Sequence, residues 1–131
     1  MTKAIQQTVT LRASAAELFD TYLNAKKHAA VIGGKVSIDV REGKAFRAFD
    51  GMLRGRNLVI VPKRLIVQAW RSSSWNKEDL DSILTLKFSD TPDGGRIELV
   101  HVNVPEHDRT GVTEGWRKYY WVPWRQYLKQ R

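Results

Sequence analysis

Apolar and polar residues alternate with a period of two in the first segment of the chain. Ile5, Val9 and Leu11 share one face and Gln7 is the exception, so residues 5–11 are predicted to form a half-buried strand. Ser14 stands three residues before Glu17, which is the spacing of a helix-starting capping box. Apolar residues then follow at helical spacing to about residue 23, and a second short helix is predicted to end at the glycine pair 33–34.

From residue 35 onward the pattern is that of β-strands. Alternating apolar positions separated by turn-forming residues predict strands at 36–40, 45–49, 52–61, 65–71, 82–89 and 97–104. The sequence Asp50-Gly51 and the stretch 90–95 are strong turn signals. Because such short connections cannot cross over a sheet, neighbouring strands are expected to be antiparallel.

The last segment, from about residue 109 to residue 131, changes to a helical pattern. One broad arc of the helical wheel carries an apolar, mainly aromatic set: Val112, Trp116, Tyr119, Tyr120, Pro123 and Tyr127. Such a helix needs an apolar surface, and the sheet is the available one. Pro123 is expected to kink the helix or to end its first half. Trp121, Trp124 and Leu128 form a second stripe, which is either wrapped by the first helices or exposed for a partner.

These elements predict an α+β fold in a single domain spanning residues 1–131. A curved antiparallel sheet of about six or seven strands surrounds a long C-terminal helix, with two short helices after the first strand.

Charge and composition narrow the classes of function. The formal net charge is +8, but lysines and arginines are scattered and no nucleic-acid-binding motif accompanies them, so nucleic-acid binding is not expected. The chain has no cysteine, no apolar leader and no stretch of about 18 apolar residues that could span a membrane. A cytoplasmic location is therefore predicted.

Residues with the potential for catalysis form no recognisable arrangement. The three histidines, His28, His101 and His107, lack the spacing of a metal site, and the serines at 72–74 lack a nucleophile-elbow motif. His101, in a predicted strand, is expected to be a hydrogen-bonded sheet histidine, with a place facing a cavity as the alternative. The prediction is a non-enzymatic protein without metal or cofactor.

Two stretches give the sequence a family resemblance. Residues 55–71 with Trp75, and the motif Gly-Trp-Arg-Lys-Tyr-Tyr-Trp at 115–121, resemble the activator of heat-shock protein 90 ATPase homologue-1-like family of the START-like superfamily. The resemblance implies the START-like (Bet v 1-like) helix-grip fold, whose members commonly hold apolar ligands between sheet and helix. The family's eukaryotic co-chaperones carry this domain behind a separate N-terminal domain, which these 131 residues do not contain.

Three hypotheses of function follow. The first is a small apolar or aromatic ligand held between sheet and helix by Trp70, Val112, Trp116, Tyr119, Tyr120 and Pro123, although each of these could also be plain core. The second is a protein-interaction module acting as a co-chaperone on an acidic partner surface. The third and weakest is a degenerate enzyme that uses His101. The sequence does not fix the oligomeric state.

Overall fold

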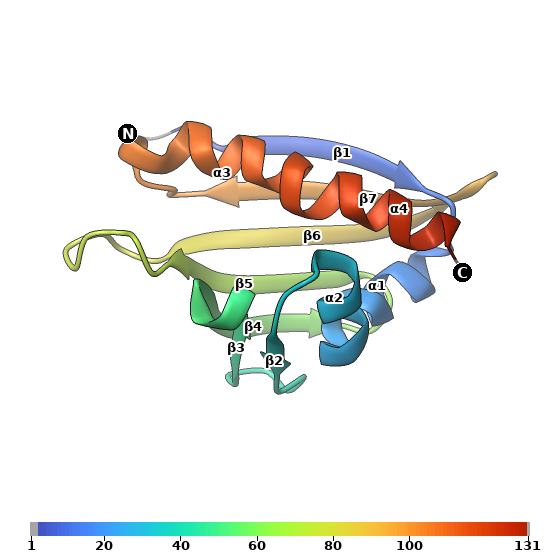
Figure 1. Cartoon of the computed structure of the whole chain (residues 1–131), viewed down its shortest axis with the longest axis horizontal. Helices are drawn as coiled ribbons and strands as arrows, with labels where there is room; N and C mark the ends of the chain where they lie inside the picture. The colour runs from blue at the N-terminus through green and yellow to red at the C-terminus, as the bar shows by residue number, and fades with distance from the viewer. Residues whose placement is uncertain (1–2, 131) are drawn as a thin grey trace.

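The computed structural model describes residues 3–130, and its framework is an antiparallel sheet of seven strands (Figure 1). The strands lie in the order β1-β7-β6-β5-β4-β3-β2. Their bounds are β1 Ile5–Leu11, β2 Val36–Ile38, β3 Ala45–Ala48, β4 Leu53–Val61, β5 Leu65–Ser72, β6 Ser82–Thr91 and β7 Gly94–Val102. The predicted antiparallel sheet is confirmed, and the long pairing of β1 with β7 brings the start of the chain beside its last strand.

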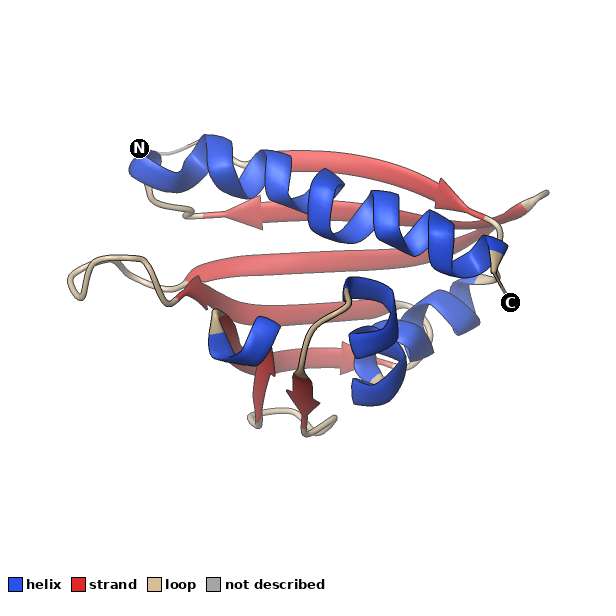
Figure 2. Cartoon of the chain, viewed as in Figure 1, coloured by secondary structure: helices blue, strands red, loops and turns tan. Residues whose placement is uncertain are grey.

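The helices lie against one face of the sheet (Figure 2). Two short helices follow β1, α1 Ala15–Leu23 and α2 Ala25–Ile32, and two single 3₁₀ turns are η1 Phe49–Gly51 and η2 Glu106–Asp108. The long C-terminal helix consists of α3 Arg109–Trp116, the π-helical segment η3 Arg117–Trp121 and α4 Val122–Lys129. This is the predicted α+β helix-grip architecture.

Local sequence signals set the ends of the first helices as predicted. The Ser14 hydroxyl accepts the Glu17 backbone N–H at 3.1 Å, and the Asn24 side chain accepts that of Lys27 at 2.9 Å. Side-chain oxygens at these positions satisfy backbone donors that have no partner within the helix. Gly33 ends α2 in the left-handed conformation, with φ of 71°.

Two strands have ends that differ from the predicted ones. The strand predicted at 36–40 stops at Ile38, because Asp39 turns to pair with Arg41 at 2.7 Å and Val40 is left 54% exposed. The strand predicted at 97–104 runs instead over 94–102, because it pairs with β6 from Gly94 onward and Asn103 leaves the strand with φ of 64°.

The C-terminal helix passes Pro123 without ending, which corrects the expectation that this residue ends the helix's first half. In η3 the helix widens, and the Val122 N–H bonds the Arg117 carbonyl five residues back. Pro123 then falls in the first turn of α4, a position at which proline's missing donor is tolerated. The wide turn also shifts the helical phase, so Trp121 and Trp124 are buried at 7% and 1% exposure. Trp124 lies beside Tyr22 and Val31, so wrapping by the first helices is observed for this residue of the stripe, whereas Trp121 is covered by β1 through its bond to Gln7.

Gly55 is required by the close approach of β4 to β5. An added Cβ at this position would lie 1.8 Å from the Ala69 carbonyl oxygen and 2.9 Å from the Phe46 ring. Gly55 faces Trp70 in the strand register, so its missing side chain leaves room for the indole on the helix-covered face.

Candidate functional site

A cavity of about 380 Å³ opens between the C-terminal helix and the β4–β5 part of the sheet. Its lining is largely apolar and comes from η1, β4, β5 and α3 with the start of η3: Phe49, Met52, Leu53, Trp70, Ser72, Ser74, Asp108, Gly111, Val112, Gly115, Trp116, Tyr119 and Tyr120. Five of the six predicted ligand residues therefore line one cavity. The sixth, Pro123, is not among the lining residues and lies one turn further along the helix, in α4.

The predicted residues divide into a cavity floor and a cavity rim. Trp70, Val112, Trp116 and Tyr120 are buried, whereas Tyr119 is 48% exposed beside Met52 at 58%. Tyr119 also meets the Phe49 ring edge-on, with 5.8 Å between ring centroids. Tyr119 thus lines the cavity from its exposed rim and not from its buried floor.

The Trp116 indole, predicted to orient a ligand, is already hydrogen-bonded within the protein. It donates its N–H to His101 Nδ1 at 3.1 Å, and His101 Nε2 lies 2.8 Å from the Ser82 hydroxyl. Ser82 donates to the Trp70 carbonyl at 2.7 Å. Because Nδ1 accepts a hydrogen bond, the proton of the neutral ring must be on Nε2, which therefore donates to the Ser82 hydroxyl.

His101 is consequently a structural group, as the sheet-histidine prediction expected. Its side chain is fully buried at 0% exposure, and burial lowers its pKa to about 3. The ring stays neutral at physiological pH and both nitrogens are engaged. These features do not favour the hypothesis of an enzyme that uses His101 as a base.

Tyr120 is likewise committed to an internal partner. Its hydroxyl lies 2.8 Å from His28 Nε2, while His28 Nδ1 lies 2.8 Å from the Tyr22 carbonyl oxygen and must donate to it. Tyr120 therefore donates to the histidine. Burial lowers the pKa of His28 to about 4 and raises that of Tyr120 well above its usual value.

The same network continues across the sheet through buried amides. The Tyr22 hydroxyl donates to Gln68 at 2.9 Å, Gln68 donates to the Asn57 side chain at 3.0 Å, and Asn57 donates to the Asp39 carbonyl at 2.8 Å. Gln68 and Asn57 are fully buried. This chain of hydrogen bonds links α1 to the segment after β2, and none of its residues lines the cavity.

The polar groups that remain at the cavity are few. Ser72 and Ser74 share a hydrogen bond of 2.8 Å, and Asp108 accepts the Trp75 indole N–H at 2.8 Å. Within residues 3–130, no group of three or more potential metal ligands comes together. The chemistry of the site is therefore apolar contact with a small polar edge.

Sequence reasoning missed three contributors to the site. Phe49 and Met52 were assigned to strand ends, and His28 to a stretch between helices. Phe49 has φ of 51°, an uncommon conformation for a bulky residue, and this directs the chain at η1 across the cavity entrance. The Asp50-Gly51 turn signal marked this place, but it did not reveal which ring would face the cavity.

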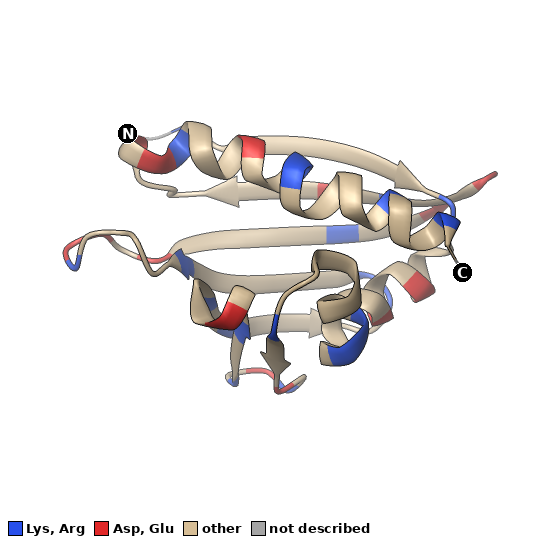
Figure 3. Cartoon of the chain, viewed as in Figure 1, with Lys and Arg blue, Asp and Glu red and all other residues tan. Residues whose placement is uncertain are grey.

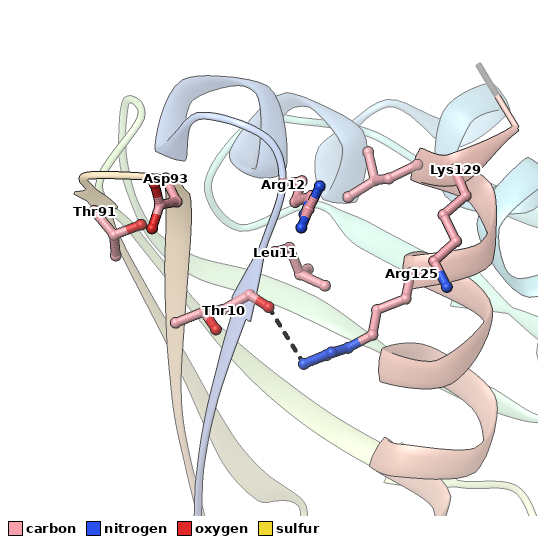
Figure 4. A pocket seen from close by; sticks show the side chains of 8 residues that line it. Thr10, Leu11, Arg12, Thr91, Asp93, Arg125 and Lys129 are labelled. Carbon is pink, nitrogen blue, oxygen red and sulfur yellow. Dashed lines mark hydrogen bonds between the residues drawn. The ribbon is translucent and has the colours of Figure 1, made fainter.

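Two further hollows lie away from the aromatic site. Figure 4 shows one of about 420 Å³, where the ends of β1 and α4 meet the β6–β7 turn and Arg12, Arg125 and Lys129 gather. Arg125 there donates to the Thr10 carbonyl at 3.2 Å. The other, of about 630 Å³, runs between β1 and the long helix, where Trp121 donates to Gln7 at 2.7 Å. That bond explains why Gln7 interrupts the alternation of β1.

The architecture and the apolar cavity beneath the long helix define the class of helix-grip domains. Residues 12–128 match the family model described as Activator of Hsp90 ATPase homolog 1-like protein, and the chain belongs to this family. No helix within residues 3–130 is long and apolar enough to cross a membrane.

Individual relatives agree with this assignment. The chain is 31% identical over 122 residues to an uncharacterised protein of Schizosaccharomyces pombe, covering 93% of this chain and 36% of that protein. It is 30% identical over 115 residues to the Homo sapiens activator of 90 kDa heat shock protein ATPase homolog 1, covering 85% and 32%. The chain thus spans about a third of the length of these curated relatives.

The solved structure of an HSP90 activator from Plasmodium falciparum has the same fold. It superposes with a TM-score of 0.87 at 20% sequence identity, covering 98% of this chain and 97% of that one.

Proposed function

We propose that this chain is a protein-interaction module that acts as a co-chaperone and stimulates the ATPase of a heat-shock protein 90 partner. The observation that carries the proposal is its 30% identity over 115 residues to the human activator. The Plasmodium falciparum activator, which the chain matches over almost the full length of both, supports the idea that one such domain can be a unit of this function.

The geometry of the interior agrees with a binding platform rather than a catalyst. The buried histidines are neutral and paired, and the Tyr120 hydroxyl and the Trp116 indole N–H both donate to them. Such a satisfied network holds the helix on the sheet in one arrangement. A rigid body of this kind offers its outer surface to a partner with little loss of conformational entropy.

The test is the ATPase rate of heat-shock protein 90 from the same organism, measured with increasing amounts of the chain. The rate should rise and saturate, and an inhibitor of the chaperone's ATP site should abolish the whole signal. Because the chain carries a +8 charge, binding should also weaken as salt is added. An unchanged rate together with no salt-sensitive binding would exclude this function.

A second candidate function is the binding of a small apolar or aromatic ligand. It is favoured by one observation, the gathering of Trp70, Val112, Trp116, Tyr119 and Tyr120 around a single cavity of about 380 Å³. That volume lies near the lower end of the roughly 300–1,000 Å³ typical of small-molecule sites. A compact ring system fits this space better than a long lipid.

NMR shift mapping with flavonoids, sterols and fatty acids tests this second function. A binding ligand should shift the signals of Val112 and Tyr120, and Gly115→Leu, which fills the cavity from the helix side, should remove the effect. If no compound shifts these residues in the unmodified chain, the ligand hypothesis is wrong. The ATPase test is independent of this result, so the two functions can be separated.

A further inference from the structure

Within residues 3–130, no helix lies on the outer face of the sheet. All helices lie on the opposite face, and Val59, Val61, Val100 and Val102 are left 37–40% exposed (Figure 1). The strand register gives two neighbouring outward rows across β4 to β7. One joins Val59, Val67, Thr85 and Val100, and the other joins Ala69, Ile83 and Val102, so the outward side chains form a strip that is apolar except for Thr85. An uncovered apolar strip of this kind is a feature of interaction surfaces.

One end of this face holds a set of arginines, here called the outer arginine cluster: Arg47, Arg54, Arg56 and Arg71. Arg47 is directly opposite Arg54 across β3 and β4, and Arg54 is directly opposite Arg71 across β4 and β5. Arg56 lies two residues after Arg54 and therefore projects from the same face. Figure 3 shows several Lys or Arg positions on the strands at this end of the sheet.

Most of the cluster's charge is uncompensated. Arg71 pairs with Asp81 at 2.8 Å, but within residues 3–130 Arg47, Arg54 and Arg56 make no ion pair. Like charges directly opposite on neighbouring strands destabilise a sheet. An arrangement that is unfavourable in the free protein becomes favourable once a negatively charged partner lies over it.

We infer that the outer arginine cluster and the apolar strip beside it form the docking surface for an acidic, amphipathic segment of a partner protein. Guanidinium groups bind carboxylates through paired hydrogen bonds, which fixes orientation as well as adding attraction. Arg56 is opposite Ala69, and the same row continues through Ile83 to Val102, so apolar contact begins beside the charges. This inference adds a binding surface to the proposed co-chaperone function. Only the identity of the partner, heat-shock protein 90, rests on that function.

The combination of arginines and apolar side chains on this surface fits an acidic protein segment better than a nucleic acid or a second copy of the chain. A nucleic acid would use the arginines but would leave the strip of valine and isoleucine without a matching surface, and no aromatic side chain on this strip offers a base-stacking platform. A second copy of the chain would bring the same +8 charge to the interface. An acidic segment with apolar residues matches both parts of the surface.

The test compares two double variants of equal charge. Arg54→Glu/Arg56→Glu reverses the cluster, and Arg64→Glu/Arg96→Glu makes the same charge change toward the opposite end of the sheet. The probe is a synthetic peptide of alternating glutamate and leucine, titrated into the isotope-labelled chain. We expect shifts at Arg47, Arg54 and Arg56, and a loss of affinity of about tenfold or more in the first variant only. Equal losses in both variants, or shifts elsewhere, would overturn the inference.

Two further probes complete the experiment. A single-stranded oligonucleotide that binds these arginines more tightly than the peptide would also overturn the inference. The ATPase assay keeps the two proposals apart. If the peptide binds at the cluster but the unmodified chain does not stimulate heat-shock protein 90, the docking surface stands and the chaperone function fails. If stimulation occurs and the cluster variant stimulates equally, the function stands and the docking surface fails.

Discussion

Trp116 on the long helix and His101 on β7 are joined by a hydrogen bond in which the indole N–H donates to Nδ1 at 3.1 Å. Neither residue is more than 3% exposed. The bond fixes the histidine tautomer and ties the helix to the sheet at the floor of the aromatic cavity. His101, which the sequence allowed either as a sheet histidine or as a cavity residue, thus links the long helix to the sheet.

Removing the indole donor should therefore destabilise the domain. Trp116→Phe keeps most of the ring but leaves His101 Nδ1 buried without a donor, so we expect a loss of about 1–3 kcal/mol in the free energy of unfolding. Urea denaturation measures it. Tyr119→Phe is the control, because that ring is 48% exposed, and it should change stability little. Equal losses in the two variants would mean that the bond contributes nothing.

The buried histidines predict a loss of stability in acid. The pKa of His28 is lowered to about 4 and that of His101 to about 3, both chiefly by burial, from an ordinary value of 6.5. Below about pH 6.5 the two histidines become protonated in the unfolded chain, whereas in the folded chain they remain neutral. The contribution is therefore fully present above about pH 6.5 and falls by about 1.4 kcal/mol per pH unit for each histidine until the folded pKa is reached.

Denaturation at a series of pH values tests this expectation. The double variant His28→Gln/His101→Gln should be less stable near neutral pH but should lose less stability between about pH 6 and pH 4. NMR offers a direct check, because the ring signals of both histidines should stay at their neutral positions down to about pH 5. Titration of either ring near its ordinary value would contradict the proposed network.

Gly55 should not tolerate a side chain. Gly55→Ala would place a methyl group 1.8 Å from a backbone carbonyl oxygen, and the resulting strand displacement should cost roughly 2–3 kcal/mol or more. Gly115→Ala is a matched control in the long helix. Its methyl group would meet only the Tyr119 ring at 3.6 Å, and better helix propensity should raise stability by about 0.5–1 kcal/mol. Thermal unfolding of both variants gives the comparison.

Replacing an arginine of the outer arginine cluster by glutamate should raise the stability of the free domain and lower its affinity for the partner. Arg54→Glu places a carboxylate between Arg47 and Arg71, so it should stabilise the free domain by about 0.2–1 kcal/mol while it weakens partner binding. Unfolding and titration experiments on the same preparation measure both effects. A variant that loses stability would show that the arginines support the sheet and are not held there for a partner.

Much of the fold could be predicted from the sequence, because strand alternation, capping residues and turn signals are local. The buried polar chain could not. Gln68 and Asn57 look like ordinary strand residues, and only the arrival of Tyr22 from α1, 46 positions away from Gln68, gives their amides a buried role. The role of His28 was missed for the same reason, since its partner Tyr120 lies 92 positions along the chain.

The sequence predicted most of the residues that line the candidate site, but it did not predict which of them face inward along the long helix. A regular helical wheel places Val112, Trp116 and Tyr120 on the buried face, and all three are buried. It also puts Tyr119 and Pro123 in that arc, but Tyr119 is 48% exposed and Pro123 does not line the cavity. The wide turn η3, which no sequence signal announced, changes the helical phase in this region. The exposed arginines were read as a solvated surface, because only strand register shows that they face one another.

The central claim is that this chain is a co-chaperone, and the ATPase rate of heat-shock protein 90 from the same organism tests it most directly. The account predicts a saturable rise in that rate when the unmodified chain is added, with a smaller rise for Arg54→Glu/Arg56→Glu than for Arg64→Glu/Arg96→Glu. A rate that stays at its basal value over the full titration, with a chain shown to be folded, would contradict it.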